Sequence, residues 1–348
     1  MDRGPDEPRA ARAPPVGTGE PPARHAAGPR PPSLRPRSAF AFEPLRDGPA
    51  QAHTGLMVRR PQLLGELRGR AGESLLHRVA GPDAHRTRAR IHGTPGPRWF
   101  APGSAVRTVH ADASMYVGGL AALLLQSLHP TAMAAVAAHS GYRSDPWGRL
   151  QRTSTFLAVT TFGTAEDAER AVGRVRETHA AIHGRTRDGV PYRASDPHLL
   201  TWVHIAETEC FLRAHQRYGR RPLGPREQDE YVAQMASVAR RLGAEDPPVT
   251  RAGLTARIAA YRPELRSTPE ARATTRFLLV EPPLPAPALA PYALLAAAAV
   301  ELLPPWARGP LELPYRTRLL LPLGRAGGRA VTGAVRWAVP PPPAPPGA

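Results

Sequence analysis

Between Gln126 and His204, polar side chains interrupt segments whose other residues are typical of buried helices. Histidines stand within these segments at His129, His139, His179 and His204, and arginines recur between them. An imidazole or guanidinium inside an apolar helix lowers stability unless it finds a hydrogen-bonding or ionic partner. One bound cofactor can be the partner of several such groups, so this stretch constrains the fold more than any other.

Proline marks the limits of the folded part. The chain has 43 prolines, which crowd residues 1–52, residues 282–314 and residues 339–348. Residues 1–52 contain few large apolar side chains, so burial cannot offset the entropy of ordering them, and we expect a disordered tail rich in proline and arginine. Residues 339–348 predict a second proline-rich tail. A single folded domain is expected over residues 53–338, which is long enough to bury a substantial core.

Arginine supplies the whole positive charge of the chain. The formal net charge is +17, and because lysine does not occur, all 46 basic residues are arginine. They are scattered in the sequence, and aromatic residues do not alternate with them as a base-stacking surface requires. Asparagine does not occur either, which points to GC-rich codon usage as the source of the bias. Nucleic acid is therefore not an expected partner.

Cys210 is the only cysteine, which excludes an internal disulfide and a multi-cysteine zinc site. Residues 1–37 contain no apolar core of a signal peptide. The most apolar later segment, residues 286–303, is interrupted by Pro287 and Pro291, and its uninterrupted part is too short to span a bilayer. We expect a core helix there, with contact to a membrane surface as the alternative. The predicted location is the cytoplasm, with or without peripheral contact to a membrane.

Helical periodicity and helix caps predict an all-α fold, a bundle-like single domain. Residues 115–139 are apolar almost all round and should form a buried helix that Pro130 kinks. His129 lies at this kink, where it either has a function or bonds a freed carbonyl. Strand patterns are nearly missing, with one short candidate around residues 331–339. Further helices are expected to begin near Leu63 and to cover residues 149–162, 226–243, 250–260 and 268–280.

Thr164 and Asp167 are spaced as a capping box and predict the helix that carries the first candidate ligand. This helix should run to about His183 and stop at Gly184. His179 falls on its apolar stripe, and a neutral imidazole on such a face is a suitable axial ligand for haem iron. A histidine satisfied within the core is the alternative. His179 and His183 are four residues apart, so on one helix they can also chelate a single transition metal.

Asp196 and Pro197 predict the start of another helix, which should reach Tyr218. It carries His204, a further candidate cofactor ligand. Glu207 and Glu209 flank this region, and each either accepts a hydrogen bond from such a ligand or faces solvent.

Arg149, Arg152 and Thr153 share one face of the expected helix over residues 149–162. If this face lines a cavity, its guanidiniums and hydroxyl can bind haem propionates or polarise bound oxygen. The alternative is a solvated basic face with Asp145 as an ion-pair partner. The sequence has no nucleophile elbow, phosphate loop or dinucleotide-binding glycine pattern, and Ala180 stands where a zinc protease has its glutamate.

The polar segments, taken in order, resemble the MpaB-type oxygenase family, to whose superfamily the latex-clearing rubber oxygenases belong. The resemblance covers residues from about 105 to 320. The matching segments are Gln126…His129-Pro130, His139-Ser140, Asp145-Pro146, Arg149-Leu150-x-Arg152-Thr153, Phe162-Gly163-Thr164, Val175-Arg176-x-x-His179, Asp188-Gly189-x-Pro191-Tyr192 and Asp196-Pro197-x-Leu199-Leu200-x-Trp202-Val203-His204.

This resemblance implies a helical fold around one haem b, with a histidine on the iron and an arginine and a threonine on the opposite, distal side. On this sequence the implied metal ligand is His179, and the implied distal residues are Arg149, Arg152 and Thr153. Arg152 replaces the lysine of some rubber oxygenases, so the same contact is not assumed. Rubber oxygenases also use a distal glutamate as a base, for which the sequence offers no clear counterpart.

The sequence therefore predicts a haem b-dependent oxygenase that uses molecular oxygen and a hydrophobic substrate. An isoprenoid-like alkene would enter a channel lined by residues 115–139. His183, His204 and His129 are further candidate cofactor ligands. The alternatives are an enzyme with a non-haem metal on the same helical scaffold, and a non-catalytic helical protein that binds lipid or touches a membrane.

Overall fold

The computed structural model describes residues 54–313 and 320–339. Within these ranges helix follows helix, so the predicted all-α class is confirmed. The predicted N-terminal tail, and the C-terminal tail beyond Val339, lie outside the described residues. The elements are α1 (Thr54–Ala80), α2 (Ala84–Gly93), α3 (Ala105–His110), α4 (Ser114–Gln126), α5 (Pro130–His139), α6 (Pro146–Phe162), α7 (Ala165–Ala181), β1 (His183–Arg185), β2 (Pro191–Arg193), α8 (Pro197–Tyr218), α9 (Pro225–Leu242), α10 (Arg251–Tyr261), η1 (Arg262–Glu264), α11 (Pro269–Leu279), α12 (Ala286–Leu302), α13 (Pro305–Arg308) and α14 (Leu320–Ala338).

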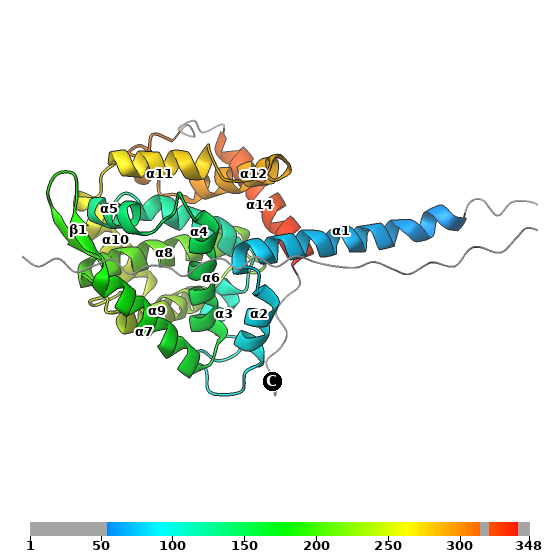
Figure 1. The fold of residues 1–348 in the computed structure, drawn as a ribbon, viewed down its shortest axis with the longest axis horizontal. Coiled ribbons are helices and arrows are strands. Elements are labelled where there is room, and N and C mark those ends of the chain that lie inside the picture. The colour runs from blue at the N-terminus through cyan, green and yellow to red at the C-terminus, as the bar shows by residue number, and fades with distance from the viewer. Residues whose placement is uncertain (1–53, 314–319, 340–348) are drawn as a thin grey trace, which may run out of the picture. The chain divides into compact units, whose positions relative to one another are not determined.

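Helix α8 lies at the centre of this unit and packs most extensively against α4 (Figure 1). Its buried side chains lie on most of its circumference, which is typical of a core helix. Helices α4 and α8 approach closely at Gly118, where an added Cβ would lie 2.9 Å from the ring of Phe211 and 3.1 Å from the Cβ of Ala214. Helices α9 and α10 contact α8, and α12 contacts α4, so this pair organises the core.

The single kinked helix predicted over residues 115–139 is wrong, because α4 and α5 are separate helices that meet at 109°. Pro130 is the first residue of α5 and not a kink inside a longer helix. At the end of α4, the carbonyl oxygen of Gln126 accepts a hydrogen bond from Nε1 of Trp202 at 3.2 Å, so the break leaves this group satisfied. Among the described helices none alone has the length and hydropathy of a membrane span, whereas the bent pair of α4 and α5 has them together.

A two-stranded antiparallel sheet connects α7 to α8, where no strand was predicted. Helix α7 ends at Ala181, so the predicted extension to His183 and the stop at Gly184 are wrong. The reason is pairing across the hairpin, which aligns Gly184 with Tyr192. Gly189, at φ 80°, supplies the left-handed backbone of the turn. The strands are too short to leave an alternating pattern in the sequence.

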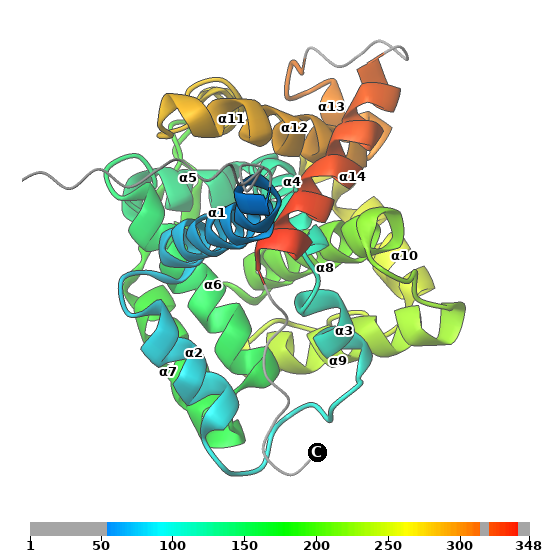
Figure 2. The ribbon, with the colours of Figure 1, turned by 90° about the vertical axis from the view of Figure 1, so that its right-hand side faces the viewer.

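The strand predicted around residues 331–339 is also wrong, because these residues belong to α14, except for Val339, which follows it. Figure 2 shows α14 running from α12 toward α8. Near its end, Arg336 donates two hydrogen bonds to the carboxylate of Asp112, at 2.8 and 3.2 Å, and one to the carbonyl oxygen of Tyr218. The Asp112 side chain is only 6% exposed, so this ion pair ties the last helix to the segment before α4.

The substitution Gly118→Ala should lower the free energy of unfolding by about 1–3 kcal/mol, because the new methyl group overpacks the contact with Phe211. Gly119→Ala is the matched control, since the nearest atom to its added Cβ lies 3.8 Å away. That substitution should stabilise the protein by about 0.4–1 kcal/mol by restricting the unfolded chain. Urea denaturation followed by circular dichroism measures both, and equal effects would contradict the close packing at Gly118.

Candidate functional site

Helix α7 carries the predicted iron ligand. Its first turn begins as predicted: the hydroxyl of Thr164 accepts a hydrogen bond from the backbone N–H of Asp167 at 3.2 Å. Along the predicted apolar stripe, exposure increases from the buried Ala168 and Val172 to the half-buried His179. The stripe therefore packs most closely against its neighbours at the start of the helix.

The imidazole of His179 is half-buried and makes no hydrogen bond with a described residue. Burial lowers the pKa of His179 below its ordinary value, which favours the neutral ring. Neither ring nitrogen has a hydrogen-bonding partner among the described residues, although the backbone carbonyl of His179 accepts from the N–H of Ile182. Such a ring is available to a ligand.

His183 does not share a helix face with His179. It stands exposed in β1, where it is aligned with Arg193 of β2. The two-histidine chelate on one helix face was a wrong prediction, because the chain leaves the helix before His183. The four-residue spacing from His179 would place both side chains on one face only if the helix continued, and α7 ends at Ala181.

Arg149 and His179 lie on two neighbouring helices, far from the turn that joins them. Helices α6 and α7 pack against each other and are joined at Gly163. Arg149 lies 14 residues before Gly163 and His179 lies 16 residues after it. At the rise of an α-helix these separations correspond to about 21 and 24 Å, so each residue lies far along its own helix from the turn.

Arg149, Arg152 and Thr153 differ in their surroundings. Arg149 is half-buried, burial lowers its pKa, and its guanidinium makes no hydrogen bond or ion pair with any described residue. Arg152 is exposed and forms an ion pair with Asp145 at 3.2 Å. The hydroxyl of Thr153 donates to the carbonyl oxygen of Arg149 at 3.1 Å. The solvated basic face that was the alternative thus describes Arg152 and Thr153, which are both exposed, whereas Arg149 is a half-buried cation with no anionic partner among the described residues.

His204 is a second uncommitted imidazole, on α8. The residue is 7% exposed, and burial, with a smaller contribution from the charge of Arg240, lowers its pKa to about 4. Its Nδ1 lies 3.4 Å from the hydroxyl of Thr208, whereas its Nε2 is buried without a hydrogen-bonding partner. An orphaned buried nitrogen is unusual enough in a folded protein to suggest an unfilled ligand role.

Glu207, three residues after His204, is an acid with a perturbed pKa. Burial raises the pKa of Glu207 to about 7, and its half-buried carboxyl makes no hydrogen bond with a described residue. Glu209 differs, because its buried carboxylate is bound by Arg251, with Oε1 3.1 Å from Nη2. The sequence left both glutamates open as hydrogen-bond acceptors or solvent-facing groups. The structure separates Glu207, a candidate proton carrier, from Glu209, a structural anion.

His110 is a polar core residue that the sequence did not single out. It ends α3, and its Nδ1 lies 2.8 Å from the hydroxyl of Thr161 on α6. Its Nε2 lies 3.5 Å from the hydroxyl of Tyr231 on α9, and its ring meets the ring of Phe211 edge-on. Burial lowers the pKa of His110 to about 3. Its six-residue helix is too short to show a periodic pattern, so the sequence could not predict that the His110 side chain is directed into the core.

His129 joins a different group of side chains. It stands at the N-cap position of α5 and is 5% exposed, and its ring contacts those of His198, Trp202 and Tyr261. Its Nδ1 lies 3.1 Å from the hydroxyl of Thr131. Among the described residues, the ring contacts of His129 are thus with α8 and the end of α10.

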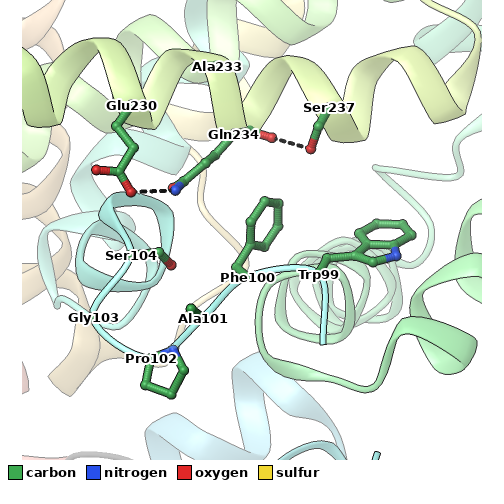
Figure 3. Close-up of a pocket in the computed structure, with 10 residues that line it drawn as sticks. All are labelled: Trp99, Phe100, Ala101, Pro102, Gly103, Ser104, Glu230, Ala233, Gln234 and Ser237. Atoms are coloured by element: carbon green, nitrogen blue, oxygen red, sulfur yellow. Dashed lines mark hydrogen bonds between the residues drawn. The ribbon is translucent and has the colours of Figure 1, made fainter. Parts of the chain in front are cut away.

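An open groove of about 570 Å³ lies between residues 99–104 and α9 (Figure 3). On its α9 side, Nε2 of Gln234 donates to Glu230 at 2.6 Å. Oε1 of Gln234 accepts from the backbone N–H of Val106 at 2.8 Å. No predicted cofactor ligand is among its lining residues, so this groove is not the predicted cofactor site.

The chain is thus an all-α protein with uncommitted histidines and an unpaired arginine in its helical body. Residues 107–337, from α3 to α14, match the model of the family described as ER-bound oxygenase mpaB/B'/rubber oxygenase, catalytic domain. The chain belongs to this family, as the sequence predicted.

The chain is also similar to two curated proteins, an uncharacterized protein of Mycobacterium tuberculosis and one of Mycobacterium bovis. Each is 34% identical to the chain over 71 residues, which are 20% of this chain and 28% of the relative. The match therefore spans little more than a quarter of the length of either relative. No solved structure matches the chain.

The substitution Glu207→Gln should stabilise the protein more at pH 8 than at pH 5, by about 1–3 kcal/mol. The carboxyl has a pKa of about 7 when folded against an ordinary value of 4.5, so folding holds a proton that the unfolded chain releases as the pH rises. That penalty is complete above pH 7 and disappears below about 4.5, and a neutral amide never meets it. Urea denaturation of both proteins at the two pH values measures the difference, and a pH-independent effect would contradict the raised pKa.

Proposed function

We propose that the protein is a haem b-dependent oxygenase that acts on a hydrophobic alkene. Membership of a family of oxygenase catalytic domains supports the proposal. The observation that carries it is the imidazole of His179 on α7, which burial favours in its neutral form and which makes no hydrogen bond with a described residue. On the neighbouring helix α6, the half-buried guanidinium of Arg149 has no anionic partner among the described residues.

These groups fit a haem b. Iron accepts a neutral imidazole as an axial ligand, and porphyrin propionates are anions that an arginine binds well. His179 would hold the iron. When bound, the haem supplies the activation of molecular oxygen, the second substrate.

The positive charge of Arg149 would bind a haem propionate or polarise bound oxygen. A desolvated guanidinium interacts more strongly with an anion than a solvated one, because water does not screen it. Arg152 would act indirectly, since its charge is already balanced by Asp145. The hydroxyl of Thr153 would first have to leave the backbone carbonyl of Arg149, to which it donates, before it could bind oxygen.

Glu207 is suited to hold or release a proton at neutral pH. A general acid or base works best when its pKa is near the working pH, and burial raises the pKa of Glu207 to about 7. Its charge acts on Cys210 and Tyr231, so it would serve a site between α8 and α9. His204, a turn away, offers its orphaned Nε2 as the alternative iron ligand.

The substrate would be apolar, an isoprenoid-like alkene. Met115 and Leu123 of α4 are half-buried apolar side chains in an otherwise buried helix, so they can line a hydrophobic channel. Such a substrate partitions into membranes, and a cytoplasmic protein that touches the membrane surface would meet it there.

Purified protein supplied with haem should show a Soret absorption band, and His179→Ala should abolish the histidine-ligated spectrum. His183→Ala is the matched control, because His183 is exposed in β1 and should leave the spectrum unchanged. His204→Ala should retain the band as well. A band that survives His179→Ala but not His204→Ala would move the ligand to α8.

The absence of any Soret band after reconstitution would refute the haem proposal. Metal analysis of the same samples separates the alternatives: iron with porphyrin supports the oxygenase, and metal without porphyrin supports a non-haem enzyme. A protein that binds lipid equally well with and without His179 would be the non-catalytic lipid binder.

Haem retention should depend on Arg149 more than on Arg152. Arg149→Gln removes an unpaired desolvated cation and should speed haem transfer to apomyoglobin roughly tenfold. Arg152→Gln removes an exposed cation that already has an anionic partner, and should change the transfer rate less than about threefold. Equal rates for the two variants would contradict a role for Arg149 in binding an anion.

A further inference from the structure

Three potential metal ligands converge where distant parts of the chain meet. His129 stands at the corner between α4 and α5, His198 in the first turn of α8, and Glu264 at the end of η1. Oε2 of Glu264 lies 2.8 Å from Nε2 of His198 and 3.4 Å from Nε2 of His129. All three ligand atoms lie within 4.8 Å of one another.

The hydrogen bonds around His198 turn the lone pair of its Nε2 toward this point. The hydroxyl of Tyr261 donates its proton to the carbonyl oxygen of His198 at 2.8 Å. The oxygen of that hydroxyl lies 3.1 Å from Nδ1 of His198 and is left to accept from Nδ1–H. The proton of a neutral His198 therefore belongs on Nδ1, which leaves Nε2 as an electron-pair donor.

His129 repeats this arrangement in a buried setting. Its Nδ1 lies 3.1 Å from the hydroxyl of Thr131, which can accept a proton from it. Its Nε2 is buried and makes no hydrogen bond, although Glu264 is nearby. Its side chain is 6% exposed, so water is largely kept from this nitrogen. A proton shared by His198 and Glu264 would satisfy those two groups and leave Nε2 of His129 orphaned, whereas a cation satisfies all three.

We propose that His129, His198 and Glu264 bind a zinc ion. Two imidazole nitrogens and a carboxylate oxygen are a ligand set that zinc accepts, and they are softer than the oxygen cages of magnesium and calcium. A tetrahedral zinc with bonds of about 2.0–2.2 Å holds its ligand atoms roughly 3.3 Å apart. The separations of 2.8 and 3.4 Å bracket that value before any ion has drawn the ligands together.

The zinc site is open on one side. The side chains of His198 and Glu264 are 50% and 43% exposed, so an ion can enter from solvent and keep a water molecule as its fourth ligand. The ion would fasten the corner between α4 and α5 to the start of α8 and to η1. This assigns His129 to zinc, and it holds whether or not α6 and α7 hold haem.

Isothermal titration of the chelator-treated full chain with zinc chloride tests the proposal. We expect one tight site per chain, and Glu264→Gln and His198→Ala should each weaken it by roughly a hundredfold or more. Both substitutions are at half-exposed positions, so they decide the outcome even if His129→Ala fails to fold. Cobalt titrated in place of zinc should give the visible absorption of a tetrahedral ion.

His85→Ala is the matched control. His85, His77 and Glu73 form the other group of potential ligands in the described ranges, and all three are exposed. Removing His85 should leave the tight site unchanged. Tight binding that is lost in His85→Ala, or that persists in both Glu264→Gln and His198→Ala, would overturn the proposal.

Tyr261→Phe tests the tautomer argument. This substitution removes the acceptor of the His198 Nδ1 proton and no metal ligand, and it should weaken zinc binding roughly tenfold. Unchanged affinity in Tyr261→Phe together with unchanged affinity in Glu264→Gln would mean that zinc binds elsewhere.

Discussion

The close packing of α4 on α8 is the contact on which the other elements depend. The pair meets at Gly118, and at its other end the indole of Trp202 binds the last carbonyl of α4. Pro130 has no N–H to bond the carbonyl of Gln126, and the N–H of His129 and the indole of Trp202 bond this carbonyl instead. The chain then turns through 109° into α5, which places His129 at a corner.

Desolvation of polar groups then gives the interior its chemical character. The body of helices lowers the pKa values of His110, His179 and His204 and raises that of Glu207. It also holds Arg149 without an anion. Each of these is a cost to folding, and such costs are tolerated where function needs them.

Local sequence signals predicted many of the helices, but they could not predict contacts between residues distant in the sequence. Thr164 and Asp196 cap the helices that they were expected to cap, because a cap depends on its neighbours alone. The hairpin after Ala181 was missed because three-residue strands leave no pattern. Family membership was predicted from the order of polar segments, whereas nothing in their spacing could bring Glu264 to His129. Whether His179, Arg149 and their neighbours hold a haem stays a prediction.

The ion pair between Arg336 and Asp112 joins the two ends of the matched span. During synthesis, the carboxylate of Asp112 leaves the ribosome more than two hundred residues before its guanidinium partner. Until then, the part of α4 and α8 that α14 contacts stays uncovered. Exposed apolar surface of this kind is bound by chaperones. The ion pair that joins the two ends of the matched span therefore forms only after the last helix has been synthesised.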